Sequence, residues 1–157
     1  MSIFRMIVMD VDGTLTDGKI YISSHGEIMK AFCVKDGLGI SKILEKGITP
    51  VIITGRESEM VKLRASELKI TEVYQGVHNK AEILKQIITK YQYSLSEVAY
   101  IGDDENDIEI MNMCAYKGCP SDAVDEVKKL SNYVCINKGG DGAVREYIEY
   151  LLKYFSA

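Results

Sequence analysis

The chain has 157 residues, of which 46% are hydrophobic and 27% charged, and its formal net charge is −4. This is the size and composition of one globular domain with one substantial core. Lysine and arginine are scattered, so the charge gives no reason to expect nucleic acid or a membrane surface as a partner. No apolar run reaches the roughly 18 residues of a transmembrane helix, and the start lacks the pattern of a signal peptide. We therefore expect a cytoplasmic protein.

The four cysteines are Cys33, Cys114, Cys119 and Cys135. They form no C-x-x-C pair, and no pair of histidines lies near them, which argues against a zinc site. In a reducing compartment, buried free thiols are the expected state. A redox pair between Cys114 and Cys119 is the weaker alternative.

Strand and helix patterns alternate along the chain. In chain order, we expect a strand at 3–9, a β-hairpin with strands at 20–23 and 28–34, a helix at 38–46, a strand at 50–54, a helix at 57–68, a strand at 72–74, a helix at 80–91, a strand at 98–102, a helix at 108–113, a strand at 115–118, a helix at 123–130, a strand at 133–136 and a helix at 143–155. This alternation predicts an α/β fold in which residues 1–157 form one doubly wound, Rossmann-like domain. Its parallel sheet would carry helices on both faces, with the hairpin inserted after the first strand.

The strongest motif, Asp10-Val11-Asp12-Gly13-Thr14, directly follows the first strand. The two-residue period of a strand lets Asp10 and Asp12 point the same way while Val11 faces the core. Asp10 can attack a phosphoryl group in line, and Asp12 can give the leaving alkoxide a proton and later activate water. An ordinary Asp-Gly turn would explain this motif equally well on its own.

Possible phosphate ligands follow the strand at 50–54. The hydroxyl of Thr54 and the amides of Gly55 and Arg56 can donate hydrogen bonds to phosphate oxygens, and the next helix adds its N-terminal dipole. Lys80 can neutralise the transferring phosphoryl group. The alternatives are an ordinary helix N-cap at Thr54 and a solvated lysine at a helix start.

Asp103, Asp104 and Asp107 crowd negative charge after the strand at 98–102. Such a cluster would repel a phosphate dianion unless a hard cation lay between them, and carboxylate oxygens suit Mg²⁺. An acidic helix N-terminus, favoured by the macrodipole, explains some of these residues. It does not explain their coincidence with Asp10 at the same expected edge of the sheet.

Taken in order, these motifs resemble the signature of the haloacid dehalogenase superfamily. The resemblance implies that Asp10 is the nucleophile, Asp12 the acid and base, and Thr54 and Lys80 phosphate ligands. It also implies that Mg²⁺ is bound by Asp10, the carbonyl of Asp12 and Asp103. In that arrangement Asp104 and Asp107 would support the metal ligands.

A closer resemblance is to 3-deoxy-D-manno-octulosonate 8-phosphate phosphatases. It rests on DVDGTLTDG, VKDGLGI, IITGR, VKLRASEL, YQG and GGDGAVRE, at residues 10–18, 34–40, 52–56, 61–68, 74–76 and 139–146. These enzymes lack a cap domain and are typically homotetramers with shared active sites, so the resemblance implies both features here. It also places Arg56 and Arg64 near the carboxylate of a sugar-acid phosphate, where bidentate pairing is favourable. For Arg64, a solvated helix face is an equal alternative.

Three other functions are considered. A related branch hydrolyses nine-carbon nonulosonate 9-phosphates (KDN or N-acylneuraminate), but the resemblance associates that branch with Glu after Thr-Gly, where this chain has Arg56. A receiver-like signalling domain would place its acceptor aspartate on a later strand. A catalytically silent scaffold is disfavoured because no core catalytic position is missing.

Overall fold

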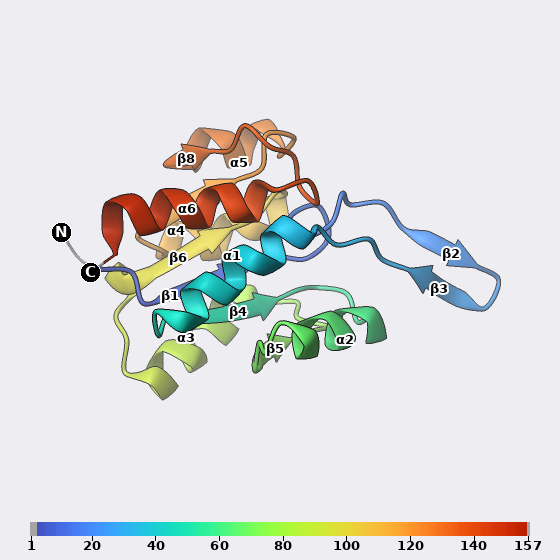
Figure 1. The fold of residues 1–157 in the computed structure, drawn as a ribbon, viewed down its shortest axis with the longest axis horizontal. Helices are drawn as coiled ribbons and strands as arrows, with labels where there is room; N and C mark the ends of the chain where they lie inside the picture. Colours follow the sequence, from blue (N-terminus) through green and yellow to red (C-terminus); the bar gives the residue numbers. More distant parts are fainter. Residues whose placement is uncertain (1–2, 157) are drawn as a thin grey trace.

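The central feature of the computed structural model, which describes residues 3–156, is one six-stranded parallel sheet (Figure 1). Its strands are β1 (Met6–Met9), β4 (Thr49–Ile53), β5 (Glu72–Tyr74), β6 (Val98–Ile101), β7 (Tyr116–Cys119) and β8 (Tyr133–Val134). Their order across the sheet is β5-β4-β1-β6-β7-β8. Strand β1 therefore lies between β4 and β6, and its register pairs Met9 with both Ile52 and Ile101.

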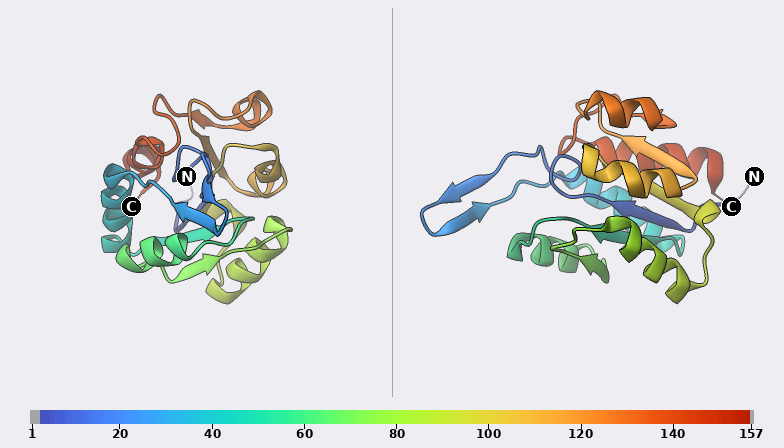
Figure 2. Two further views of the ribbon diagram at one scale, coloured as in Figure 1. Left: turned by 90° about the vertical axis from the view of Figure 1, so that its right-hand side faces the viewer. Right: turned by 180° about the vertical axis from the view of Figure 1, so that it is seen from behind.

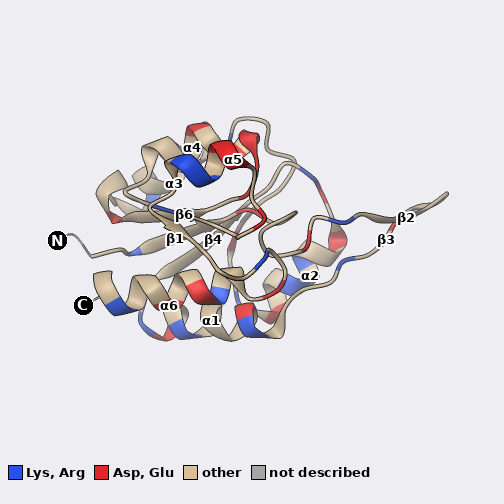
Figure 3. Ribbon diagram, turned by 90° about the horizontal axis from the view of Figure 1, so that it is seen from above, with Lys and Arg blue, Asp and Glu red and all other residues tan. Residues whose placement is uncertain are grey.

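Helices cover both faces of the sheet, as predicted. They are α1 (Val34–Glu45), α2 (Glu59–Glu67), α3 (Lys80–Tyr91), α4 (Ile108–Met113), α5 (Asp125–Leu130) and α6 (Ala143–Phe155), with 3-10 turns η1 (Leu95–Glu97) and η2 (Glu105–Asp107). Helices α1, α2 and α6 pack on one face, and α3, α4 and α5 on the other (Figure 3). The predicted doubly wound α/β fold without a cap domain is confirmed for the part of the chain that the structure describes.

The apolar sequence of β1 explains why it is the central strand. Ile7 and Met9 point into the core beneath α1 and α6, and Met6 and Val8 into the core beneath α3 and α4. All four side chains are fully buried. A strand covered on both faces requires such an uninterrupted apolar run.

The hairpin consists of β2 (Tyr21–Ser23) and β3 (Gly26–Met29), and it projects beyond the carboxyl edge of the sheet (Figures 1 and 2). The predicted second strand at 28–34 is wrong, because β3 ends at Met29. Beyond that residue the chain returns to the domain, where the side chain of Lys30 is buried and Phe32 packs on the core.

The predicted helix at 38–46 also begins too late, since α1 starts at Val34. Conversely, the helix predicted from residue 57 begins at Glu59. Its N-cap is Ser58, whose hydroxyl accepts a hydrogen bond of 3.2 Å from the amide of Met60. Other element ends differ from the prediction by a few residues, the largest difference being the late start of β1 at Met6.

The four cysteines are free, with Cys114, Cys119 and Cys135 buried and Cys33 partly buried. Burial raises the pKa of the Cys114 thiol to about 12, so it is protonated and unreactive at neutral pH. Within residues 3–156, no helix is long and apolar enough to span a lipid bilayer.

Candidate active site

The predicted site residues follow three adjacent strands of the sheet. Asp10 comes directly after β1, Thr54 directly after β4, and Asp103 two residues after β6. Because these three strands are neighbours and parallel, their carboxyl ends meet at one edge. This is the edge at which open α/β sheets bind their ligands.

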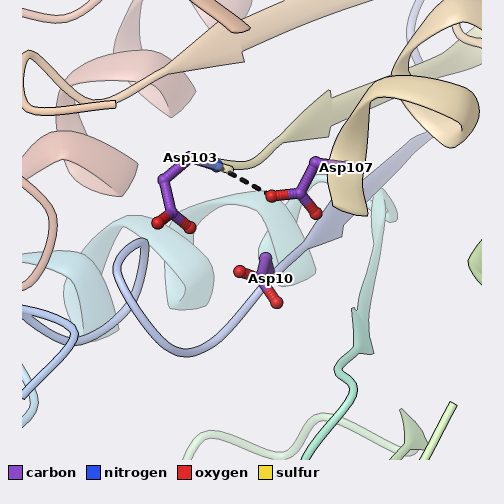
Figure 4. Close-up of side chains that lie close together, drawn as sticks. All are labelled: Asp10, Asp103 and Asp107. Atoms are coloured by element: carbon purple, nitrogen blue, oxygen red, sulfur yellow. Dashed lines mark hydrogen bonds between the residues drawn. The ribbon is translucent and has the colours of Figure 1, made fainter. Parts of the chain in front are cut away.

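Three carboxylates converge at this edge. Asp10, Asp103 and Asp107 each offer an oxygen, and these oxygens all lie within 4.8 Å of one another (Figure 4). Burial, reinforced by the neighbouring negative charges, raises the pKa of Asp10 and of Asp103. Binding of a proton or of a cation at this cluster is therefore favoured over three uncompensated negative charges.

Lys80 supplies a positive charge to this cluster. Its Nζ lies 2.9 Å from Oδ1 of Asp10 and 2.8 Å from Oδ1 of Asp107. Burial opposes its charge, but the two carboxylates outweigh that effect and raise the pKa of Lys80. Since Lys80 is only 4% exposed, the alternative of a solvated lysine at a helix start is wrong.

Asp107 is fully buried and its carboxylate is fully occupied by protein donors. Oδ2 accepts hydrogen bonds from the amides of Asp103 (2.9 Å) and Asp104 (3.1 Å), and Oδ1 accepts from Lys80 and from the hydroxyl of Tyr100. Asp107 thus shapes the loop that presents Asp103. The side chain of Asp104 is exposed and caps η2, so it does not join the cluster.

Gly13 and Thr14 fit closely against Asp103. The hydroxyl of Thr14 donates a hydrogen bond of 2.9 Å to Oδ1 of Asp103. Gly13 has φ +91°, and a Cβ atom at this position would lie 2.0 Å from Oδ2 of Asp103. Only glycine allows both this backbone conformation and this close approach.

The donor set fits a hard divalent cation. Asp10 is buried and Asp103 partly buried, at the ends of the neighbouring strands β1 and β6, and three carboxylates lie near the charge of Lys80. Oxygen ligands and an excess of negative charge are what Mg²⁺ requires. Asp10 and Asp103 would hold the ion, and Asp107 would orient Asp103.

Asp12 lies two residues beyond Asp10 and is partly exposed. Oδ1 of Asp12 is 2.6 Å from Nζ of Lys30, a residue that directly follows β3 of the hairpin. The side chain of Asp12 is 22% exposed and that of Lys30 only 2%. Asp12 therefore faces solvent on one side and the base of the hairpin on the other.

Thr54 is buried at the end of β4. Its amide donates to the carbonyl of Tyr74, and its carbonyl accepts from the amide of Val77, which fixes the turn that Gly55 continues. The alternative of an ordinary helix N-cap is wrong for Thr54, since Ser58 caps α2.

The two arginines lie apart from the carboxylate cluster. The side chain of Arg56 is 48% exposed, with its guanidinium 3.9 Å from Oε2 of Glu27. Arg64 pairs with Glu67 at 3.2 Å and lies over the ring of Phe32. Within the described residues, neither arginine makes an ion pair with an aspartate.

Three contacts of the site were not predicted, those of Thr14, Lys30 and Tyr100. Thr14 belongs to the motif that follows β1, so the sequence could have indicated that its hydroxyl lies near Asp103. Tyr100 lies in β6 on the face shared with Val98, so its hydroxyl could have been placed near this edge by the strand period. No local pattern marks Lys30, which reaches Asp12 only through the path of the hairpin.

Carboxylates and a lysine gathered at the carboxyl edge of a doubly wound sheet form an arrangement suited to phosphoryl transfer, as in hydrolases that act on phosphate esters. Residues 58–148 match the family described as haloacid dehalogenase-like hydrolase. The 3-deoxy-D-manno-octulosonate 8-phosphate phosphatase KdsC of Escherichia coli K12 is 40% identical over 94% of this chain and 79% of that protein. The chain belongs to this phosphatase family within the haloacid dehalogenase-like hydrolases, which confirms the resemblance seen in the sequence.

Crystal structures of related phosphatases have the same fold. The enzyme of Moraxella catarrhalis, in complex with magnesium, phosphate and KDO, is 40% identical and has a TM-score of 0.92, with 96% of this chain and 86% of that chain covered. The cobalt-bound enzyme of Haemophilus influenzae is 31% identical and has a TM-score of 0.93, with coverage of 96% and 88%. The receiver-like and scaffold alternatives are thereby set aside, since the relatives are named phosphatases.

Proposed function

We propose that this chain is a magnesium-dependent phosphatase that hydrolyses 3-deoxy-D-manno-octulosonate 8-phosphate. The proposal is carried by the cluster of Asp10, Asp103 and Asp107 with Lys80, beside Asp12. The relatives support the substrate, because one is named for it and another was crystallised with magnesium, phosphate and KDO.

The reaction requires two displacements at phosphorus. A carboxylate oxygen of Asp10 attacks the phosphorus atom, forming an Asp10–phosphate bond while the bond to the sugar oxygen breaks. Asp12 gives its proton to that oxygen. Water then attacks the phospho-enzyme, Asp12 takes the proton from this water, and inorganic phosphate leaves with Asp10 restored. Magnesium, when bound at Asp10 and Asp103, supplies positive charge against the phosphoryl oxygens.

The remaining predicted residues would bind the substrate. Thr54 and Gly55 lie beside Asp10 at the sheet edge and can donate to the phosphoryl oxygens, and Lys80 neutralises charge there. Arg56 is 48% exposed at the same edge and its ion pair with Glu27 is long, at 3.9 Å, so its guanidinium could turn to the carboxylate of a sugar acid. Arg64 is paired with Glu67 in this chain, and in the proposed tetramer it would serve the active site of a neighbouring subunit.

The alternative substrate is a nine-carbon nonulosonate 9-phosphate. A matched pair of eight- and nine-carbon keto-sugar phosphates separates the two, because discrimination between close homologues is typically about 10- to 200-fold. We expect kcat/KM to be about tenfold or more higher for the eight-carbon substrate. The opposite ranking would select the nine-carbon alternative, and no release of phosphate from either would overturn the proposal.

We further propose a homotetramer with shared active sites. The hairpin exposes large apolar side chains on both strands, with Ile22 65% and Ile28 57% exposed. Two strands alone are marginally stable in water, and closed symmetry would bury their edges. We retain the cytoplasm as the expected compartment, in which the four free thiols would remain reduced.

A further inference from the structure

The carboxylate of Asp12 depends on a lysine of the hairpin. Among the interactions of residues 3–156, the charged partner of Asp12 is Lys30, with 2.6 Å between Nζ and Oδ1. The Lys30 side chain is only 2% exposed, and lysine is almost never buried so deeply without a partner. The ion pair therefore holds the ammonium group against Asp12.

The same ammonium group also contacts Glu27 of β3, a residue that links the hairpin to the N-terminus of α2. Nζ of Lys30 lies 3.2 Å from Oε2 of Glu27. Glu27 in turn accepts a hydrogen bond from the hydroxyl of Ser58, the N-cap of α2, and lies 3.9 Å from Arg56. A continuous series of polar contacts thus joins the start of α2, the base of the hairpin and Asp12.

Asp10 and Asp12 each contact a lysine, but the two lysines come from different parts of the fold. Lys80 begins α3, which packs on the sheet, and it is held by Asp107 as well as by Asp10. Lys30 follows a two-stranded hairpin that pairs with no strand of the central sheet. The orientation of Asp12 therefore follows the placement of the hairpin, whereas that of Asp10 follows the core.

We propose that Lys30 is a positioning residue that holds the carboxylate of Asp12 in the orientation needed for proton transfer. This inference rests on the proposed function, since it builds on Asp12 as acid and base. A reacting group displaced by about 1 Å can cost about 100-fold in rate. The competing role is that Lys30 binds the substrate directly. In that case substitution of Lys30 would raise KM and leave kcat unchanged.

Steady-state kinetics of Lys30→Met and Lys30→Arg separate these roles. For Lys30→Met we expect kcat to fall about 10- to 100-fold with KM changed less than about threefold. Lys30→Arg keeps the charge and should recover part of the loss. Lys19→Met, which removes an exposed charge from the same insertion, is the matched control and should leave kcat unchanged.

Three outcomes of this comparison would overturn the proposal. The first is a rise in KM with kcat retained, and the second is no change in either constant. The third is a Lys30→Met protein whose mass by light scattering differs from that of the parent, since the loss would then follow from assembly.

A double-mutant cycle with Asp12→Ala tests whether Lys30 acts through Asp12. With p-nitrophenyl phosphate as substrate, Lys30→Met should cause no further loss of kcat in the Asp12→Ala background. Losses that multiply would overturn the positioning role while leaving the proposed function intact. A parent protein that hydrolyses neither this ester nor the sugar-acid phosphate would overturn the proposed function, and the role of Lys30 with it.

Discussion

Gly13 and Asp103 are packed so closely that a Cβ atom on Gly13 would lie 2.0 Å from Oδ2 of Asp103. Gly13→Ala should therefore displace the Asp103 carboxylate and weaken magnesium binding. We expect the magnesium concentration for half-maximal activity to rise about tenfold or more, as seen when supporting contacts of metal sites are lost. Gly47→Ala is the matched control, because Gly47 also has a positive φ of +73° but open space around it. Equal effects of the two variants would assign the loss to backbone strain.

Asp10→Asn tests the nucleophile. The substitution keeps the size of the side chain and removes its nucleophilic oxygen, so turnover should vanish while the circular-dichroism spectrum stays unchanged. Acid-quenched parent enzyme should carry a phosphoryl group on the peptide that contains Asp10, detected by mass spectrometry. Turnover of Asp10→Asn within about tenfold of the parent would contradict the assignment, since loss of a nucleophile costs several orders of magnitude.

Metal removal tests the carboxylate cluster. EDTA should abolish activity and added Mg²⁺ should restore it, because Asp10 and Asp103 then recover their counter-charge. Calcium should substitute poorly, since its larger and looser coordination misplaces the reacting groups. Phosphate release at the full rate in metal-free buffer is the result that would reject the site.

The edge of the sheet was predictable because Asp10 and Asp103 each lie within two residues of the end of an apolar strand. Asp10 and Asp103 are far apart in the chain, yet parallel strands bring their carboxyl ends together whatever lies between. The start of α1 was not predictable in the same way. Gly37 and Gly39 lower its helix propensity, but they allow Arg64 and Arg145 to pack against the helix, and this tertiary contact outweighs propensity.

Asp36 gives a pH-dependent contribution to stability. Burial raises its pKa to about 6, an effect that the hydrogen bond from the amide of Arg145 and the charge of Arg64 only partly offset. Among residues 3–156, its Oδ2 has no hydrogen-bond partner. In the unfolded chain its pKa would be about 3.9. At pH values between about 3.9 and 6, Asp36 is protonated in the folded state and ionised in the unfolded chain. The stabilisation from this protonation is therefore fully present at low pH and is lost as the pH rises to about 6.

Asp36→Asn should remove this dependence. We expect the free energy of unfolding of the variant, relative to the parent, to increase by up to about 3 kcal/mol between about pH 4 and pH 7. Urea unfolding at several pH values measures it. A difference that stays constant with pH would show that Asp36 titrates normally in the folded state.

The exposed apolar side chains of the hairpin test the proposed assembly. The double variant Ile22→Asp/Ile28→Asp should be monomeric in light scattering. Association would bury two aspartate charges in the interface without partners, which is unfavourable. Tyr154→Asp is the control, since Tyr154 is 53% exposed in the last turn of α6. The C-terminal end of α6 and the hairpin lie at opposite ends of the domain (Figure 1). A tetramer that survives the double substitution would exclude the hairpin as the interface, and a parent that is a fully active monomer would exclude shared active sites.

Lys80 lies on the central domain, whereas Lys30 follows the hairpin. We therefore expect the part of the site around Asp12 to unfold before the part around Asp10. Amide protons of β1, which is paired on both sides, should exchange with deuterium only when the whole domain unfolds. In a monomer, those of β2 and β3, which pair with each other in a separate two-stranded sheet, should exchange by local opening at far lower free energy. Because the contact between Lys30 and Asp12 lies outside the central sheet, moderate urea should weaken proton transfer by Asp12 while Asp10 remains in a folded core.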